Sequence, residues 1–581
     1  MQVCDTFNRL NLTERIETGF YGLGTANTFL EVNPTANVIV IESTTTIGGV
    51  WAGSRLYPGL KTNNMLGTYE YSGFPMSTET YGVKPGEHIP GPVVHRYLND
   101  YAKAFNLVDK IRLNHKVESA EHENRGGWLL KVSDIAEGKQ SQILASKLVV
   151  ATGLTSDAFL PEFVGNDSFG VPLFHPKDFP QYAGTVNTMQ SVCVFGGTKV
   201  AWDVVYAYAS KGVKVDWIIR ESGHGPAAMA PPYVSPLKIA LESLVATRFL
   251  TWFNPCIWGN SDGYVRIRSF LHGTALGRFF VGKFWAVLQS DLESSNRYDS
   301  HSETAKLKPW ADPFFMASGL SILNYESDFF SLVRDGSIQI HIADIASLTP
   351  KTVHLSDGQR LSTDALISCT GWKYSPPLTF LPEGVDLGLP HVSDPREPIK
   401  LIKQADKHLL TQFPTLRDQP VLNPKLKSIQ DTEGIVHSDQ APESLEPYRL
   451  YRFMVPPAFA TSHDIAFAGS LLTITTSIVV RAQSLWIAAY LNNKLPMPPD
   501  IIYETVLYSR FGKWRYPAGF GDRFPDMGMD SLPYVDMLLG DLGLDSHRKK
   551  GIFKEIFEAY GPEDYKGLVD EWKKAHQNDG L

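Results

Sequence analysis

Residues 190–222 constrain the fold of this chain more than any other segment, because they spell out a complete βαβ unit. They read QSVCVFGGTKVAWDVVYAYASKGVKVDWIIRES: an apolar strand, a glycine turn, an amphipathic helix and a second apolar strand. Residues 14–43 repeat the turn, the helix and the second strand. Each unit is followed by an apolar strand that ends in Thr-Gly, at Gly153 and Gly371, where the backbone can turn tightly beside a ligand. The sequence therefore predicts an α/β protein with two Rossmann-like dinucleotide-binding domains and mainly parallel sheets.

The first unit carries residues of the kind that bind a dinucleotide. In such a turn the glycines let the backbone approach the pyrophosphate, and the N-terminus of the helix attracts the phosphates. Gly19 and Gly22 stand at the second and third glycine positions. Glu42 follows Gly22 by 20 residues, where an acidic side chain takes the ribose hydroxyls.

The second unit differs at its strand end. Gly196 is in place and Gly197 is tolerated, while Thr198 and Ala201 hold the second and third glycine positions. Its second strand ends in Arg220 rather than in an acid, which suits the additional phosphate of NADP. The alternatives are ordinary turns and a solvated arginine, but two units with opposite charges at their strand ends favour two nucleotide sites.

The first unit lacks an apolar strand before its turn, and Glu17 stands where the first glycine belongs. Either the chain has lost tight binding at this site, or a wrong exon boundary has replaced the strand. The abrupt return of the pattern at Gly19 favours the second explanation. We expect residues 7–18 to be unable to replace a buried strand, because many of their side chains would lose water without an evident partner. These side chains are Asn8, Arg9, Asn11, Glu14, Arg15 and Glu17.

Three further motifs identify a family resemblance. Residues 48–51 read GGVW, residues 57–64 read YPGLKTNN, and residues 169–179 read FGVPLFHPKDF. Together they resemble the class B flavin monooxygenases, which include the flavin-containing and Baeyer–Villiger monooxygenases, and in particular a fungal branch tied to secondary metabolism. The resemblance spans about residues 19–495. It departs from the family in the third motif, where Val171 replaces a glycine.

The resemblance implies FAD in the first site and NADPH in the second, with reduced flavin capturing O2 as a C4a-peroxyflavin that oxidises a hydrophobic small molecule, such as a polyketide. Gly48, Gly49 and Trp51 would pack against the flavin side of FAD, and Gly469 would approach it from the closing strand. Thr62 and Asn63 form the TN of the second motif, and Asn63 would donate a hydrogen bond near the peroxide.

Several alternatives remain open. Asn63 could be a turn-forming residue. His175, the second candidate catalytic residue, either couples domain movement, in preference to donating protons, or is an ordinary loop histidine. The chain could also be an oxidase or reductase of the same fold that forms no stable peroxide. A further alternative is a non-catalytic remnant with impaired FAD binding. The substrate, the atom that is oxygenated and the oligomeric state are not determined by the sequence.

Composition excludes several functions. The 581 residues carry a formal net charge of -8, which gives no basic footprint for nucleic acid. Four scattered cysteines fit neither a disulfide framework nor a metal site, and favour a reducing, cytoplasmic compartment. The N-terminus lacks the apolar core of a secretory signal. The most apolar window, residues 465–491, contains Arg481 and Gln483, so we expect a buried helix rather than a membrane span.

The predicted domains are residues 1–165, the first part of the FAD domain; 166–375, the NADPH domain with a helical insertion at about 230–330; 376–500, the closing part of the FAD domain; and 501–581, an extension with no evident chemistry. Residues 236–288 are dense in Phe, Trp and Leu at helical spacing. They predict either a helical subdomain with its own core, or a substrate lid or a patch in peripheral contact with a membrane.

Overall fold

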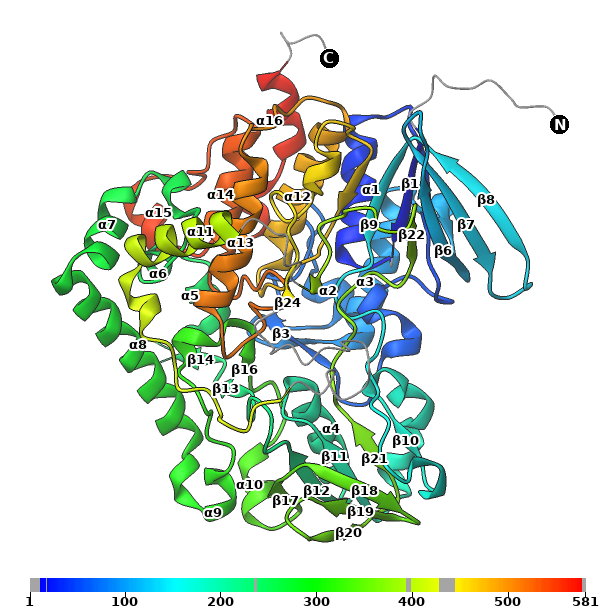
Figure 1. Cartoon of the computed structure of the whole chain (residues 1–581), viewed down its shortest axis with the longest axis vertical. Helices are drawn as coiled ribbons and strands as arrows, with labels where there is room; N and C mark the ends of the chain where they lie inside the picture. The colour runs from blue at the N-terminus through cyan, green and yellow to red at the C-terminus, as the bar shows by residue number, and fades with distance from the viewer. Residues whose placement is uncertain (1–10, 17, 235–237, 393–398, 428–444, 577–581) are drawn as a thin grey trace.

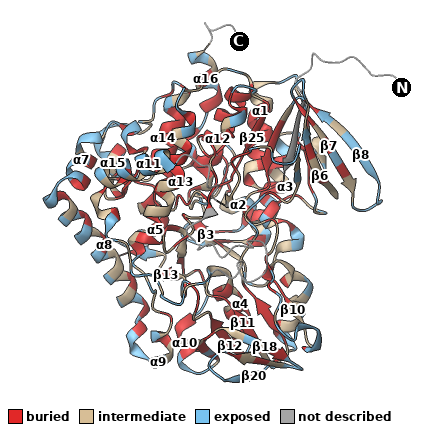
Figure 2. Cartoon of the chain, in the orientation of Figure 1, coloured by how far each residue is buried: buried red, intermediate tan, exposed pale blue. Residues whose placement is uncertain are grey.

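The computed structural model describes residues 11–16, 18–234, 238–392, 399–427 and 445–576. In Figure 1 one α/β unit occupies the upper right, a second lies below it, and helices from the middle and the end of the chain form the left side. Buried side chains run through all three parts (Figure 2).

The first unit contains a parallel sheet in the order β25-β9-β1-β2-β5. A second sheet in the order β22-β6-β7-β8 lies beside it in Figure 1. The strands of the first sheet are β1 (Asn11–Ile16), β2 (Asn37–Ile41), β5 (Ile111–Arg112), β9 (Lys147–Ala151) and β25 (Ile465–Phe467). Those of the second are β6 (His115–His122), β7 (Trp128–Asp134), β8 (Gln140–Ala145) and β22 (Thr379–Leu381).

β1 occupies the strand position that the sequence appears to lack. It runs parallel to both neighbours, with Leu12 opposite Val38 of β2 and Lys147 of β9. The expectation that this segment cannot replace the first strand is therefore wrong for the backbone. The reason is that ladder hydrogen bonds use main-chain N–H and C=O groups, which polar residues also carry. Glu17, at the first glycine position, lies outside the described residues.

Helix α1 (Phe20–Val32) packs on α12 (Thr476–Leu491), which comes from much later in the chain. The approach is close because Gly24 has no side chain: a Cβ there would lie 2.7 Å from Val480 Cγ2. Residues of α12 are buried on almost every side, so the apolar window does contain a buried helix, preceded by the short strand β25. Helix α3 (Gly91–Ala104) adds Tyr97 and Leu98 to the same core.

The second unit is a parallel sheet in the order β10-β21-β11-β12-β17. Helix α4 (Lys199–Ala209) connects β11 to β12, as the βαβ pattern predicts. An antiparallel sheet, β18-β19-β20, follows β17. The strands are β10 (Leu173–Phe174), β11 (Ser191–Phe195), β12 (Lys214–Ile219), β17 (Ile338–Ile342), β18 (Ile345–Thr349), β19 (Thr352–Leu355), β20 (Arg360–Ser362) and β21 (Leu366–Ser368).

Between β12 and β17 the chain forms an insertion of short strands and helices. Its buried side chains, including Leu250 and Trp285, join the core that contains Val192 and Trp217 of the second sheet. A separate core, one of the two predicted alternatives, is therefore not observed. The main elements are β13 (Ala228–Ala230), β14 (Tyr233–Val234), β15 (Ile239–Ala240), α5 (Leu241–Val245), α6 (Arg248–Trp252), α7 (Val265–Gly273), α8 (Ala275–Asn296), α9 (Ser302–Ala305), β16 (Leu320–Ile322) and α10 (Phe329–Arg334).

The C-terminal extension is joined to the insertion by buried polar contacts. The fully buried guanidinium of Arg248 in α6 pairs with Asp536 of α14 at 2.6 Å and with Glu555 of α15. Asp526 accepts hydrogen bonds from the amide and the hydroxyl of Ser318, which belongs to the insertion. The helices of the closing region are α11 (Ile399–Gln412), α13 (Ile501–Arg515), α14 (Ser531–Asp541), α15 (Ile552–Phe557) and α16 (Leu568–Ala575).

Candidate cofactor and active site

The first glycine turn leads directly into α1. Gly19 is the N-cap residue, and its carbonyl accepts the Leu23 amide at 3.1 Å. A Cβ on Gly19 would lie 3.7 Å from the Gly49 Cα and 3.8 Å from the Gly48 carbonyl oxygen. Gly22 is buried within the first turn of the helix. The fold thus brings together two glycine motifs that lie about 30 residues apart in the chain.

The acidic side chain at the end of β2 lies beside this turn. The buried carboxylate of Glu42 accepts the amide of Thr18 at 2.5 Å and its hydroxyl at 3.0 Å. It also accepts the amide and the hydroxyl of Thr44, both at 2.8 Å. The Thr18 hydroxyl accepts the Gly48 amide at 2.9 Å. The sequence predicts Glu42 but not the two threonines. Thr18 directly precedes Gly19, and Thr44 lies two residues after Glu42.

The GGVW motif needs its glycines for steric reasons. Gly48 has φ +142° and Gly49 has φ +57°, and a Cβ on Gly48 would lie 2.7 Å from the amide nitrogen of Ala52. The Trp51 indole donates to the Tyr69 hydroxyl at 3.0 Å. Burial raises the pKa of Tyr69 to about 12, so this phenol is neutral at physiological pH.

Gly469, at the end of β25, meets α1 on the other side of the turn. It has φ +71°, and a Cβ there would lie 2.5 Å from the ring of Tyr21. Its amide donates to the Gln483 side-chain oxygen at 3.2 Å. The hydroxyl of Tyr21 is buried and has no hydrogen-bond partner in the described part of the chain. A buried hydroxyl that has no protein partner normally forms a hydrogen bond with water or with a ligand.

These features fit the diphosphate and ribose of FAD. No described side chain covers the glycine backbone at the start of α1, and the carboxylate of Glu42 lies next to it. The Tyr21 hydroxyl can form a hydrogen bond to a ligand, since it has no partner among the described residues. Gly19 would approach the diphosphate and Glu42 would bind the ribose, while Gly48 and Gly49 would pack against the flavin side of FAD.

The TN pair lies on β3 (Lys61–Met65), and its two side chains behave differently. The buried Thr62 hydroxyl donates to the Asn64 carbonyl at 2.5 Å and accepts the Ile89 amide at 3.0 Å, so it links β3 to β4 (His88–Pro90). The half-buried Asn63 side chain donates to the Ser321 hydroxyl of β16 at 3.2 Å. Asn63 therefore connects the first unit to the insertion, whereas the Thr62 hydroxyl already has internal partners.

A buried carboxylate next to this strand was not predicted. Glu242 of α5 accepts the Asn64 side chain at 2.8 Å, the Met65 amide at 2.9 Å and the Thr68 hydroxyl at 3.0 Å. Burial raises the pKa of Glu242. Asn64 also donates to the Ile474 carbonyl at 2.9 Å. Glu242 thus ties the end of β3 to α5, and Asn64 ties it to the loop that precedes α12.

The second glycine turn also depends on close backbone approach. Gly196 has φ +126°, and a Cβ there would lie 2.4 Å from the Cys369 carbonyl oxygen. A Cβ on Gly197 would lie 2.5 Å from the Gly225 carbonyl oxygen. Gly153 and Gly371, predicted at the Thr-Gly turns that follow β9 and β21, have φ +63° and φ +88°. Both turns are therefore placed at strand ends, where a nucleotide binds in this fold.

Arg220 lies at the end of β12 and already has protein partners. One of its guanidinium nitrogens donates to the Ser222 hydroxyl at 2.8 Å and to the Lys427 carbonyl at 2.9 Å. Its Nε lies 3.5 Å from a carboxylate oxygen of Asp344. Burial lowers the pKa of Arg220, which still remains charged at neutral pH because the ordinary value is far above 7. Glu42 and Arg220 thus occupy the ends of different sheets.

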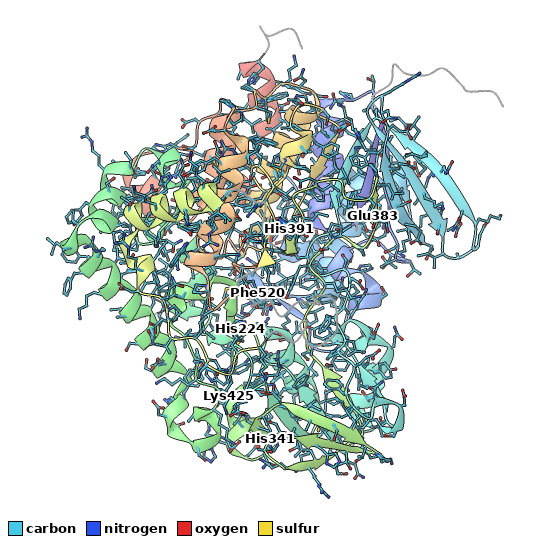
Figure 3. The ribbon with its side chains drawn as sticks, in the orientation of Figure 1. His224, His341, Glu383, His391, Lys425 and Phe520 are labelled. Carbon is cyan, nitrogen blue, oxygen red and sulfur yellow. The ribbon has the colours of Figure 1, made fainter. Side chains whose placement is uncertain are left out.

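Residues 423–427 lie over the same strand end, which the sequence did not indicate. Asn423 donates to the Glu221 carbonyl at 2.6 Å, and the Lys425 ammonium pairs with the Glu221 carboxylate. Figure 3 shows Lys425 above His341 of β17. This segment therefore places additional basic groups near the end of β12.

His175 connects the linker between the two units to the Thr-Gly turn after β21. Its Nδ1 accepts the Lys177 amide at 3.1 Å, and the ring contacts the Gly371 backbone. The rings of His175 and Trp372 meet edge-on at 4.8 Å, and Trp372 also lies under the Arg55 guanidinium. Burial lowers the pKa of His175 to about 4, so the imidazole is neutral at pH 7. This geometry suits a residue that holds the linker rather than one that donates protons.

A polar cluster that the sequence did not reveal bridges the two units. Lys199, the first residue of α4, pairs with Asp203 and donates to the Asn324 side chain at 2.8 Å. Asp203 also accepts the Tyr57 hydroxyl at 3.0 Å. Asn324 in turn donates to the Thr62 carbonyl at 3.0 Å. The start of the second nucleotide-binding helix is thus tied to the strand that carries Asn63.

The chain is similar in sequence to known flavoproteins. Residues 23–249 match the family described as pyridine nucleotide-disulphide oxidoreductase. The chain is 33% identical to the FAD-dependent monooxygenase resA of Aspergillus sclerotiorum, with 97% of this chain and 98% of the relative covered. It is 30% identical to the FAD-dependent monooxygenase DEP4 of Alternaria brassicicola, with 96% and 94% covered.

The fold is similar to that of solved monooxygenases. An open structure of cyclohexanone monooxygenase matches with a TM-score of 0.59 at 14% identity, over 92% of this chain and 97% of that one. Polycyclic ketone monooxygenase from Thermothelomyces thermophila matches with a TM-score of 0.58 at 13% identity, over 93% and 88%. The fold agrees with the two Rossmann-like units that the sequence predicts. This chain belongs to the family of FAD-dependent monooxygenases.

Proposed function

We propose that this protein uses FAD, NADPH and O2 to insert one oxygen atom into a hydrophobic small molecule in secondary metabolism. The observation that carries the proposal is the pair of nucleotide turns with opposite charges at their strand ends, Glu42 in the first unit and Arg220 in the second. An acid suits a ribose with free hydroxyls, and an arginine suits a 2′-phosphate. The sequence similarity to monooxygenases of Aspergillus and Alternaria supports the assignment to secondary metabolism.

The first unit would bind FAD. Bound FAD would supply the redox chemistry, by accepting electrons and activating O2. The protein would supply placement: Gly19 would admit the diphosphate, Glu42 would orient the ribose, and Gly48, Gly49, Trp51 and Gly469 would line the flavin side of the site. Thr62 would support this wall indirectly, since its hydroxyl holds β3 against β4.

The second unit would bind NADPH. Gly196, Gly197 and the start of α4 would receive the diphosphate, and Arg220 would bind the 2′-phosphate by a charge-assisted hydrogen bond. To do so, the guanidinium would give up its bond to the Lys427 carbonyl while keeping Asp344 as a counter-charge. Gly371 and His175 would hold the linker between the two nucleotide sites.

Asn63 is the residue we propose for the oxygen-transfer site. Its side-chain amide donates to the Ser321 hydroxyl, and its strand is fixed by Glu242 and by the cluster around Lys199. Such a rigidly supported amide can donate a hydrogen bond to a reacting oxygen without reorganisation. The insertion contributes both Ser321 and Glu242 next to β3, and its apolar residues would form the wall that a hydrophobic substrate needs.

The experiment is to follow NADPH oxidation by the FAD-loaded protein with and without O2, while hydrogen peroxide is measured. A monooxygenase consumes NADPH faster when its substrate and O2 are both present, and releases less peroxide per NADPH when oxygen is transferred to substrate. A flavin oxidase would convert all the O2 consumed to peroxide with every small molecule tested. Reduction of other acceptors without O2 consumption would identify a reductase.

A further inference from the structure

The outer face of the insertion exposes aromatic and aliphatic side chains. On α8, Leu276 is 57% exposed, Phe279 56%, Phe280 46% and Val287 59%. On α7, Phe270 is 43% exposed. Soluble proteins rarely leave large contiguous apolar patches uncovered unless the patch binds something.

The patch continues onto α15 of the C-terminal extension. The ring centroid of Phe284 on α8 lies 6.4 Å from that of Phe249, which lies 5.4 Å from that of Phe557. Phe557 lies 4.9 Å from Phe553, which is 73% exposed. Segments about 270 residues apart in sequence therefore share one apolar surface. We define the aromatic face by Leu276, Phe279, Phe280, Val287, Phe553 and Phe557.

The charges around the aromatic face are basic. Residues 265–290 contain no Asp or Glu, whereas Arg266 and Lys283 are exposed and Arg278 is half-buried. The ammonium group of Lys283 lies 5.6 Å from the Phe279 ring centroid. The acids of α8, Asp291 and Glu293, lie near its C-terminal end, and Glu293 pairs with Lys308 at 2.9 Å. A helix that exposes apolar side chains beside basic residues, with no acid before residue 291, suits a membrane interface.

The part of the aromatic face on α15 also has basic residues beside exposed apolar side chains. Lys550 and Lys554 flank the exposed Ile552 and Phe553. The one exposed acid of this short region, Glu558, lies 3.1 Å from Lys549 and 3.6 Å from Lys554. The basic residues therefore outnumber the acid, and the surface potential favours an anionic partner.

We propose that the aromatic face docks this protein onto an anionic phospholipid surface, with α8 parallel to the bilayer and its phenyl rings in the headgroup region. Charge complementarity selects this occupant, because basic side chains next to exposed rings match anionic headgroups above acyl chains. Among the described residues, no helix is long and apolar enough to cross a membrane.

Docking has a consequence for substrate supply. The insertion that carries α8 also contributes Ser321 and Glu242, which contact Asn63 and Asn64 at the site. A hydrophobic molecule dissolved in the bilayer would therefore lie next to the insertion, which contacts the strand that carries Asn63. The docking itself does not rest on the proposed oxygenation, and its test uses no turnover.

The test is co-sedimentation of the FAD-loaded protein with phosphatidylcholine vesicles and with vesicles of phosphatidylcholine and phosphatidylserine. The double variant Phe279→Ser, Phe280→Ser removes two exposed rings without disturbing buried packing. The matched control is Leu144→Ser, which changes a side chain of similar exposure, 57%, on β8 at the opposite side of the molecule. A third variant, Arg278→Glu, Lys283→Glu, reverses the local charge.

We expect the parent and the Leu144→Ser variant to bind phosphatidylserine vesicles more strongly than phosphatidylcholine alone, with weaker binding at high salt. The ring and charge variants should each lose at least tenfold in partition coefficient while keeping the parent melting temperature and FAD content. Failure of the parent to bind either vesicle, or equal binding by the ring variant, would overturn the proposal. A parent dimer that dissociates in the ring variant without any vesicle binding would instead identify the face as a self-association surface.

Discussion

Asn63 contacts the insertion through one hydrogen bond to Ser321. If its amide donates to the reacting oxygen, Asn63→Ala should leave flavin reduction by NADPH nearly unchanged and divert electrons to hydrogen peroxide. Loss of one such donor reduces productive turnover by about 10²–10³-fold. The measurement is the ratio of peroxide to NADPH consumed. Ser321→Ala is the control, since it removes the partner but keeps the amide; coupled turnover unchanged in Asn63→Ala would show that Asn63 is structural.

Substitution of Arg220 tests whether the second site binds NADPH rather than NADH. Arg220→Ala should weaken NADPH binding by about 1–3 kcal/mol, because it removes a charge-assisted contact with the 2′-phosphate. NADH lacks that phosphate, so its affinity serves as the internal control and should change little. Titration of the flavin-loaded protein with both nucleotides measures the difference. Equal NADPH affinity in the variant and the parent would exclude the role proposed for Arg220.

His175 links stability to pH. The folded-state pKa of about 4 lies below the ordinary value of 6.5, so the unfolded chain binds the proton more readily between these pH values. The stability associated with neutral His175 is fully present above about pH 6.5 and declines as pH falls toward 4, by about 1.4 kcal/mol per pH unit for this group. Urea unfolding at pH 5 and pH 7 should show a smaller difference in His175→Gln than in the parent. An identical pH dependence would show that His175 is not buried in its neutral form.

At the scale of elements, the junction of β25 and α1 has no room for a side chain. Gly469→Ala should reduce FAD retention, because the new methyl group would lie 2.5 Å from the Tyr21 ring and displace α1. Gly82→Ala is a matched control, with φ +76° against φ +71° at Gly469 and nothing within 4 Å of the added Cβ. Both variants carry the same backbone strain of about 1–2 kcal/mol. FAD remaining after gel filtration measures the difference, and equal retention would contradict the steric account.

β1 poses a different question, because its backbone pairs as required while its sequence, NLTERI, is polar. Large apolar side chains in a central strand contribute about 1.5–3 kcal/mol each. We therefore predict that replacing residues 7–18 by an apolar strand ending in Gly-x raises both the melting temperature and the affinity for FAD. Tight FAD binding and equal stability in the 581-residue chain would show that the polar strand serves as well.

The elements that could be predicted are those whose signals are local. Glycine spacing placed Gly19 and Gly196, and strand ends placed Glu42 and Arg220, since each depends on residues within one βαβ unit. Glu242 could not be predicted, because its partner Asn64 lies 178 residues away. The role of the C-terminal extension was missed for the same reason: Asp526 and Ser318 are 208 residues apart. The strand β1 could not be predicted from an apolar pattern, because its sequence is polar. Its place in the sheet depends on backbone hydrogen bonds to β2 and β9.

At the scale of the molecule, the two nucleotide units, the insertion and the C-terminal extension are coupled through buried polar contacts. Lys199 and Asn324 tie the second unit to the TN strand, and Arg248 ties the insertion to α14 and α15. Breaking a buried ion pair by removing one partner typically costs about 3–5 kcal/mol. The insertion and the extension therefore cannot be treated as removable additions to a flavoprotein core.

If this assembly binds FAD and reduces it with NADPH before O2 reacts, the flavin spectrum should show each of these steps. The most direct measurement is the visible absorbance of the FAD-loaded protein during anaerobic titration with NADPH, followed by admission of air. We predict a bound oxidised flavin spectrum that bleaches with NADPH, bleaches much less readily with NADH, and returns when O2 enters. A protein that acquires no flavin spectrum on loading, or a bound flavin that neither nucleotide reduces, would contradict this prediction.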